Sequence, residues 1–150
     1  MSKGIVNHVG LTVGNMDEAV RFWTEFLGMP PTHRGTMVGG PMADLCGIDG
    51  VTVEGAKFDL PNSAYLELYD YKAADRQANG ESTANIGNIH FCLWMDDVRS
   101  SLKRALDLGA RCVSKNGLLA IHKGPSAGTS AVYLRIHDGI TLELVGPTVD

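Results

Sequence analysis

The sequence has few of the features that assign a chain to a specialised class. It contains only three cysteines, which form no Cys-x-x-Cys pair and cannot all be bridged internally, so a reducing compartment fits best. No apolar run approaches the roughly eighteen residues that a membrane span needs, and the first thirty residues carry no basic-then-apolar leader pattern. We therefore expect a soluble, cytoplasmic protein that does not enter a membrane.

An excess of charge of one sign is also missing. Thirteen Lys and Arg residues stand against seventeen Asp and Glu residues, which gives a net charge of −4, and no block of consecutive basic residues occurs. This balance disfavours nucleic acid and anionic membranes as partners. Hydrophobic residues make up 44% and charged residues 20%, which is ordinary globular usage and excludes disorder as the main state.

The chain instead contains an internal repeat. Residues 7–13, Asn-His-Val-Gly-Leu-Thr-Val, match residues 89–95, Ile-His-Phe-Cys-Leu-Trp-Met. Each alternating run leads through acidic residues into an apolar pattern of helical spacing that ends at a glycine, Gly28 or Gly109. Each copy also ends in a strand pattern that contains Leu-Glu-Leu. The repeat predicts an α+β fold built from two tandem βαβββ modules.

We place these modules at about 4–72 and 86–146, joined by a polar linker over 72–85 within a single domain 1–150. The spacing from the histidine to the glutamate differs between the two modules. From His8 to Glu67 there are 59 residues, and from His90 to Glu143 there are 53. We expect the extra residues in the Pro- and Gly-rich loop 30–50, with one short helix near its residues 41–46.

Four potential metal ligands occupy equivalent positions in the two copies. Because strand side chains alternate between faces, His8 and His90 point away from the apolar face, and so do Glu67 and Glu143, which each lie between two leucines. A lone strand His or Glu is most simply a structural or solvated group. The joint repetition favours one divalent metal ion, for which two imidazoles and two carboxylates suit Zn²⁺, Ni²⁺, Co²⁺, Mn²⁺ or Fe²⁺. Without an ion, two inward carboxylates would repel each other.

Several residues are weaker candidates. His122 precedes a Gly-rich stretch that could close over a ligand, although an ordinary surface loop is the simpler interpretation. We interpret Cys92 as a small residue in the pocket wall. His33, in the variable loop, and His137, at a hairpin turn, are expected to be exposed. Pocket lining and dimer contact are both consistent with the aromatic residues that share the faces of Glu67 and His90, which are Tyr65, Tyr69, Tyr71 and Trp94.

The sequence resembles the vicinal oxygen chelate superfamily, the group of glyoxalase I, bleomycin-resistance proteins and ring-cleaving dioxygenases, over nearly its whole length. The resemblance rests on His8 opening the first strand, Glu67 in Tyr-Leu-Glu-Leu, His90 in Asn-Ile-His-Phe and Glu143 in Gly-Ile-Thr-Leu-Glu-Leu. It implies a mixed sheet cupped around the metal ion, a small-molecule substrate with adjacent oxygens, and a homodimer.

Glyoxalase I and the related epimerases place a ligand at all four of these positions, whereas ring-cleaving dioxygenases use three, which correspond to His8, His90 and Glu143. Glu67 therefore favours a glyoxalase-like lyase or isomerase. By resemblance, Glu143 would remove a proton beside a metal-chelated carbonyl, through an enediolate or enolate, and Glu67 would act as a second acid/base or as a simple ligand. The turn Arg-Ile-His-Asp-Gly and the lack of a basic cluster for glutathione or CoA argue against glyoxalase itself.

Two alternatives remain open. Tyr133 lies ten residues before Glu143, as a pocket tyrosine does in the ring-cleaving dioxygenases, and His122 precedes it in the same module. An Fe²⁺ or Mn²⁺ extradiol dioxygenase would use these two residues as acid/base groups. The other alternative is a non-catalytic resistance protein that binds a drug, but the proteins of that kind lack the ligand set.

Overall fold

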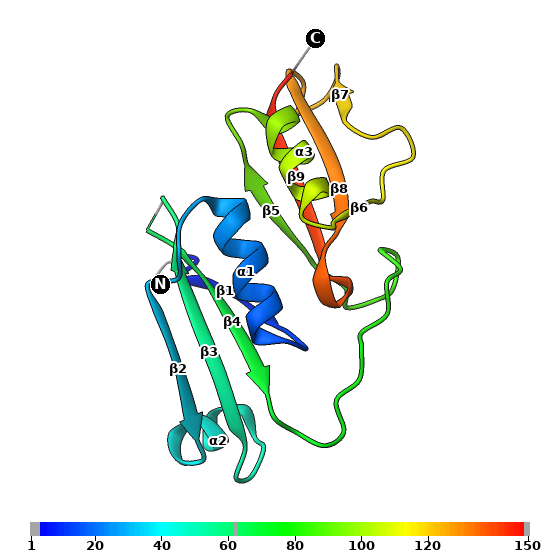
Figure 1. The fold of residues 1–150 in the computed structure, drawn as a ribbon. Helices are drawn as coiled ribbons and strands as arrows, with labels where there is room; N and C mark the ends of the chain where they lie inside the picture. The colour runs from blue at the N-terminus through cyan, green and yellow to red at the C-terminus, as the bar shows by residue number, and fades with distance from the viewer. Residues whose placement is uncertain (1–3, 62, 149–150) are drawn as a thin grey trace. The chain divides into compact units, whose positions relative to one another are not determined.

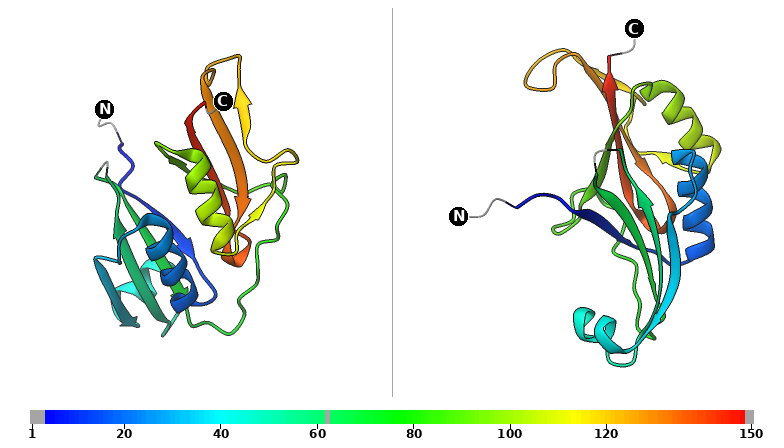
Figure 2. Two further views of the ribbon diagram at one scale, coloured as in Figure 1. Left: turned by 45° about the horizontal axis from the view of Figure 1, so that its top comes forward. Right: turned by 90° about the vertical axis from the view of Figure 1, so that its left-hand side faces the viewer.

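A computed structural model describes residues 4–61 and 63–148 (Figure 1). The contacts within it divide the chain into two compact units, Met1–Gln77 and Ala78–Asp150. The boundary lies inside the predicted linker, and residues 72–89 form no helix or strand. Each unit has its own sheet, with a helix over one face (Figures 1 and 2). The mixed α+β class predicted from the repeat is confirmed.

The first unit is a βαβββ module with one insertion. Its sheet has the order β1-β4-β3-β2, in which β1 and β4 are parallel and the other pairs are antiparallel. The short helix expected near residues 41–46 is present between β2 and β3. His33 is exposed as expected, but it opens a strand and does not lie in a loop. The elements are β1 (His8–Thr12), α1 (Met16–Leu27), β2 (His33–Val38), α2 (Gly40–Cys46), β3 (Thr52–Asp59) and β4 (Tyr65–Tyr71).

The second unit repeats this plan with a divided strand. Its sheet has the order β5-β9-β8-β6, and β7 also pairs with β8, so two short strands take one edge. The pair β5 and β9 is parallel, as β1 and β4 are. The elements are β5 (His90–Trp94), α3 (Val98–Asp107), β6 (Arg111–Cys112), β7 (Leu119–Ile121), β8 (Thr129–Arg135), the 3-10 turn η1 (His137–Gly139) and β9 (Thr141–Pro147).

The expectation that His137 is exposed is wrong. Its side chain is only 6% exposed, and its Nδ1 lies 2.9 Å from Oδ2 of Asp138. Asp138 and Gly139 both have positive φ, 56° and 74°, and the Ile140 amide donates to the His137 carbonyl at 3.2 Å. This tight turn places the His137 side chain against the protein instead of in solvent.

The apolar stripe of α1 forms the core of the first unit. Ala19, Trp23 and Phe26 are fully buried against the sheet, where Leu66 and Leu68 are also fully buried. The helix begins at Met16, after Asn15, whose side-chain oxygen accepts a hydrogen bond from the Glu18 amide at 3.2 Å. It ends at Gly28, whose φ of 73° is in the left-handed region that favours glycine.

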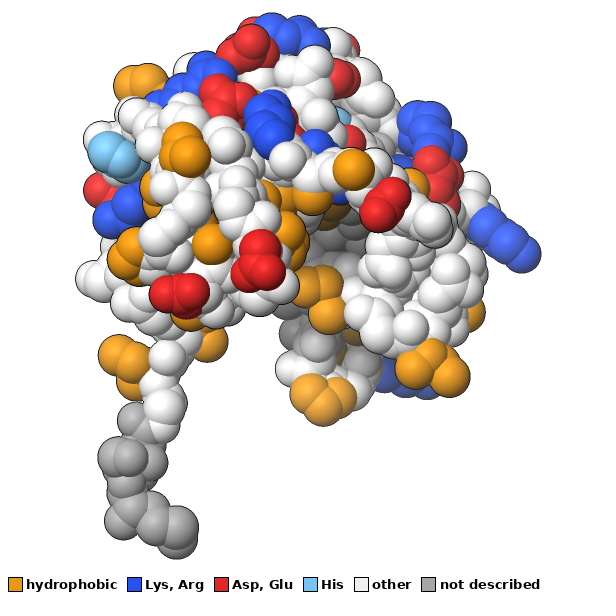
Figure 3. Space-filling model, turned by 90° about the horizontal axis from the view of Figure 1, so that it is seen from below, with side chains coloured by type: hydrophobic (Ala, Val, Ile, Leu, Met, Phe, Trp, Pro, Cys, Tyr) orange, Lys and Arg blue, Asp and Glu red, His pale blue; other side chains and the backbone are white. Residues whose placement is uncertain are grey.

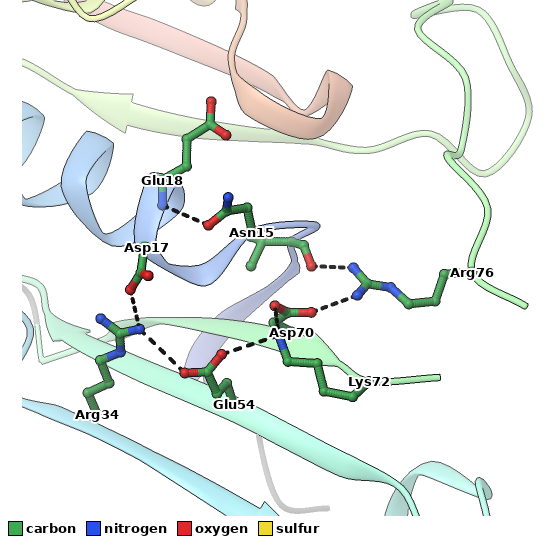
Figure 4. A network of polar contacts seen from close by, with 9 residues as sticks. Asn15, Asp17, Glu18, Arg34, Glu54, Asp70, Lys72 and Arg76 are labelled. Carbon is green, nitrogen blue, oxygen red and sulfur yellow. Dashed lines mark hydrogen bonds and ion pairs between the residues drawn. The ribbon is translucent and has the colours of Figure 1, made fainter. Parts of the chain in front are cut away.

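A network of ion pairs ties the first residues of the linker to the first unit (Figure 4). The Asp70 carboxylate, whose side chain is 1% exposed, accepts from Arg76 Nη1 at 2.6 Å and from Lys72. Arg76 Nη2 donates to the Val13 carbonyl at 2.6 Å. Lys72 also forms an ion pair with Glu54. Glu54 and Asp17 both form ion pairs with Arg34.

On the face drawn in Figure 3, Lys and Arg side chains are interspersed with Asp and Glu side chains. Among the described residues, no helix is both long and apolar enough to span a membrane.

Candidate metal centre

Strand register brings His8 and Glu67 together in the first unit. The parallel pairing of β1 with β4 sets His8 opposite Tyr65 and Gly10 opposite Glu67, so the His and the Glu are diagonal neighbours on one face. The Nε2 atom of His8 lies 3.4 Å from Oε2 of Glu67. The opposite face of β4 carries the buried leucines under α1, which leaves this pair on the open face, with the side chains 40% and 20% exposed.

The second unit builds the same pair from β5 and β9. Cys92 stands opposite Glu143, and His90 stands opposite Thr141. The Nε2 atom of His90 lies 3.0 Å from Oε2 of Glu143, and the two side chains are 43% and 18% exposed. Each unit therefore contributes two of the four predicted ligands. Among residues 4–61 and 63–148, the structure places no group of three or more His, Cys, Asp or Glu side chains so that it could hold an ion.

Asn7 and Tyr65 contact His8 of the first pair. Nδ1 of His8 lies 2.9 Å from Oδ1 of Asn7, which also accepts from the Tyr65 hydroxyl at 2.7 Å. Because an amide oxygen only accepts, this contact places the proton of a neutral imidazole on Nδ1, and Nε2 then has the lone pair that binds a metal. The Tyr65 ring stacks on His8, with centroids 5.0 Å apart.

The Tyr69 hydroxyl donates a hydrogen bond to Oε2 of Glu67. Burial, and then this bond to Glu67, raise the pKa of Tyr69 above its ordinary value of 10, so the hydroxyl stays protonated and remains a donor. Lys57 stands opposite Glu67 in the register, but its Nζ lies 3.0 Å from Asp59 Oδ1 and 4.2 Å from the centre of the Tyr65 ring. The hydrogen bond on Glu67 thus comes from a neutral phenol.

The second pair has different neighbours. The Tyr133 hydroxyl lies 3.5 Å from Nδ1 of His90, and the two rings are 5.1 Å apart. Burial, and then the negative charge of Glu143, raise the pKa of Tyr133. The same two causes raise the pKa of Cys92 to about 12, so its thiol is neutral at physiological pH. Tyr133 and Cys92 therefore face the pair as neutral groups.

The structure brings some of the weaker candidates to these pairs and leaves others apart. Tyr65 and Tyr133 lie beside the histidines. Trp94 shares the face of His90 and is 60% exposed, but it lies four residues along the strand, about 13 Å at 3.3 Å per residue. His122 follows Ile121, which pairs with Thr129, and Thr129 is four residues along β8 from Tyr133. The register therefore does not bring His122 to the His90–Glu143 pair.

Two contacts of the first pair were not predicted from the sequence. Asn7 immediately precedes His8, and nothing in the strand pattern indicated that its side chain would turn back to the imidazole. Tyr69 shares the face of Glu67 two residues away, so the sequence did place it correctly. Its hydrogen bond to the carboxylate is visible only in the structure.

The chain matches the model of the Glyoxalase/Bleomycin resistance protein/Dioxygenase superfamily over residues 5–144. It belongs to that superfamily, as the repeated His and Glu positions indicated.

One curated relative and several solved structures give a more detailed comparison. The chain is 31% identical over 147 residues to a 2-epi-5-epi-valiolone epimerase from an Actinomyces species, with 93% of this chain and 78% of that protein covered. Among solved structures, a glyoxalase family protein from Bacillus cereus has a TM-score of 0.78 and 20% identity, with 99% of both chains covered. A glyoxalase I mutant from Zea mays has a TM-score of 0.63 and 19% identity, covering 95% of this chain and 47% of that one.

A fosfomycin resistance protein from Listeria monocytogenes, solved with Mn(II) and a sulfate ion, has a TM-score of 0.60 at 12% identity, with 99% of this chain and 96% of that chain covered. At these identities the solved structures show a shared fold. The Actinomyces relative adds a catalytic activity to the comparison, that of an epimerase.

Proposed function

We propose that this protein is a metal-dependent epimerase or isomerase that removes and returns a proton beside a carbonyl group. One observation carries the proposal: each module presents a His–Glu pair on its open face, with the Nε2 and Oε2 atoms 3.4 Å apart in one and 3.0 Å apart in the other. The name of the Actinomyces relative supports the reaction type.

The donor set fits a divalent ion. His8 is held in the tautomer that leaves Nε2 free for ligation, because Asn7 accepts from Nδ1. His8, Glu67, His90 and Glu143 would hold one ion together. When bound, the ion would supply Lewis-acid polarisation of a substrate carbonyl, which lowers the barrier by several kcal/mol.

The carboxylates would move the proton. Glu143 is the proposed base, which removes a proton from the carbon next to the carbonyl, and Glu67 is either a second acid/base or a ligand alone. Return of a proton to the opposite face of that carbon inverts its configuration. Tyr133 and Tyr65 flank the histidines and would line the pocket for the substrate.

The substrate class follows from the same chemistry. An epimerase of this type needs a stereocentre whose hydrogen is acidified by an adjacent carbonyl, and two neighbouring oxygens that can chelate the ion. The suffix of valiolone denotes a ketone, so we propose a ketone with an adjacent oxygen as the substrate. The relative's own compound, 2-epi-5-epi-valiolone, is the first one to test.

The experiment uses the full chain stripped of metal by a chelator and reloaded separately with Mn²⁺, Co²⁺, Ni²⁺, Zn²⁺ or Fe²⁺. Each form is incubated with 2-epi-5-epi-valiolone in D₂O, and proton NMR follows both deuterium uptake beside the carbonyl and the appearance of the epimer. We expect exchange with a reloaded form and none with the stripped protein. A hemithioacetal of glutathione and a 2-oxo thioester provide the parallel assays for a glyoxalase-type lyase and a CoA-dependent isomerase. Absence of exchange with every metal and substrate would refute the proposal.

The runner-up is an extradiol dioxygenase, which the contact between Tyr133 and His90 favours. Oxygen consumption by the Fe²⁺- or Mn²⁺-loaded protein with a catechol would support it, and Glu67 would then leave the ion. Tight stoichiometric binding of a drug by the metal-free protein would instead indicate a resistance protein that binds without catalysis.

We further propose that the chain acts as one domain, in a homodimer, in the cytoplasm. Sedimentation equilibrium of the purified protein at several concentrations tests the dimer. A single monomeric species throughout would exclude it.

A further inference from the structure

The two His–Glu pairs are not equivalent, and their difference lies in what holds each carboxylate. Thr12 stands opposite Tyr69 in the first unit, and Trp94 stands opposite Val145 in the second. Val145 therefore occupies the position that Tyr69 occupies, two residues after the Glu of its own pair. Glu67 accepts from a phenol. Glu143 instead lies beside the Cys92 thiol and the imidazole of His90, and no phenol donates a hydrogen bond to it among the described residues. A thiol is a weak donor.

Glycines on the two neighbouring strands leave room for the Tyr69 ring. Gly55 stands directly opposite Tyr69 on β3, and Gly10 lies on the other neighbouring strand, β1. A Cβ at Gly55 would be 3.6 Å from Tyr69 Cε1, and a Cβ at Gly10 would be 3.8 Å from Tyr69 Cε2. Neither glycine has a positive φ, so the backbone does not require them. The Tyr69 ring lies over both glycines, and Met37 Cε also lies over Gly55, so a bulky side chain at either position would contact the ring.

The two histidines differ as the two carboxylates do, because the histidine of the first module has the closer hydrogen-bond partner. Nδ1 of His8 lies 2.9 Å from the side-chain oxygen of Asn7. The same oxygen also accepts a hydrogen bond from the Tyr65 hydroxyl. The residue before His90 is Ile89, where the first module has Asn7. Nδ1 of His90 lies 3.5 Å from the Tyr133 hydroxyl. In the first module, side chains form hydrogen bonds to both proposed ligands. In the second module, the partners of the proposed ligands are a weaker donor and a more distant hydroxyl.

We propose that Tyr69 is a positioning residue that holds Glu67 as a fixed metal ligand, a support that Val145 does not give to Glu143. This inference rests on the proposed function. Outer hydrogen bonds of this kind fix the orientation of a ligand, and their removal typically weakens metal binding by 10–100-fold.

The test compares Tyr69→Phe with Tyr71→Phe in the full chain. Tyr71 lies on the same face and its ring centre is 6.0 Å from that of Tyr69, but its hydroxyl makes no hydrogen bond to Glu67. Both changes remove one phenol oxygen. The dissociation constant for Co²⁺ is measured by competition with a chromophoric chelator, and the visible absorption spectrum of the Co²⁺-loaded protein reports its coordination. Circular dichroism and the thermal midpoint confirm that both variants fold.

We expect Tyr69→Phe to raise the Co²⁺ dissociation constant at least about 10-fold and to change the visible spectrum. Tyr71→Phe should change neither by more than about twofold, because no bond to a ligand is lost. In a Glu67→Gln background, Tyr69→Phe should have no further effect, since Tyr69 acts through Glu67.

Equal affinity and an identical spectrum for Tyr69→Phe and the parent would overturn the inference, and so would an undiminished effect of Tyr69→Phe in the Glu67→Gln background. These results would leave the proposed function intact. Failure of the parent protein itself to bind Co²⁺, Mn²⁺ or Zn²⁺ would instead overturn the proposed function, and the role of Tyr69 with it.

Discussion

Replacing Gly146 with alanine should destabilise the second unit because the strand has no room for a methyl group. A Cβ at Gly146 would lie 2.2 Å from the Met95 carbonyl oxygen and 3.1 Å from Val98 Cβ. An ordinary carbon-to-oxygen contact is about 3.3 Å, so the backbone of β9 or of the turn after β5 must move by about 1 Å. The obstructing atom is backbone, and it cannot move aside by a rotation of a side chain.

The cost follows from that displacement. Overpacking a closely packed position costs about 1–3 kcal/mol. The amide of Met95 donates to the Val145 carbonyl at 2.7 Å, one residue from the clash, and stretching this bond adds about 1 kcal/mol. We therefore expect a loss of about 2–4 kcal/mol in the free energy of unfolding. For a chain of this length, that corresponds to a fall of roughly 5–15 °C in the thermal midpoint.

Differential scanning calorimetry or urea unfolding of the full chain measures this loss. Gly55→Ala is the control, because its Cβ would meet only Met37 Cε at 3.4 Å and the Tyr69 ring at 3.6 Å, which are ordinary contacts of side chains. The control should stay within about 1 kcal/mol of the parent. A thermal midpoint for Gly146→Ala equal to that of the parent, or to that of an equally destabilised Gly55→Ala, would refute the reasoning.

Three further changes test other features. Arg76→Ala removes a partner of the buried Asp70 carboxylate and should cost about 1–3 kcal/mol in urea unfolding; an unchanged midpoint would show that the ion pair contributes nothing. The hydroxyl and amide of Ser100 hold the pKa of Asp97 below its ordinary 3.8, so this cap stabilises the fold above about pH 4 and loses its effect as the pH falls through the lowered pKa. Asp97→Asn should therefore weaken the acid dependence of the thermal midpoint below pH 4, and an acid dependence like the parent's would contradict this. Glu143→Gln should lower turnover by about 10²–10⁴-fold while the protein still binds metal, and full activity would remove Glu143 from the role of base.

The sequence predicted the parts of the fold that depend on local periodicity. Alternation in residues 7–13 and 89–95 placed the histidines on the open face, and the two Leu-Glu-Leu patterns did the same for Glu67 and Glu143. The helices followed from their apolar stripes and caps. These signals are strong because each residue's face depends only on its own position in a strand or helix.

The remaining features depend on tertiary contacts. His33 falls in a strand because it pairs with Lys57 of β3, far along the chain. The strand at the edge of the second sheet is divided into β6 and β7, which are too short to show a period. The hydrogen bond of Tyr69 depends on the space above Gly10 and Gly55, which lie on two other strands. No pattern within one segment carries this information.

The parallel pairing of β1 with β4, and of β5 with β9, affects when the His and Glu of each proposed ligand pair first come together. The His and Glu of the two pairs are separated by 59 and 53 residues, and they meet only after the intervening helix and strands are in place and the parallel ladder has closed. Such distant contacts form late, because the entropy of closing a long loop is lost before they form. A zinc finger, whose ligands are close in sequence, can use the metal to direct its folding. At the site proposed here the order would be reversed: the polypeptide would first reach its native topology, and an ion would then bind to a protein that has already folded.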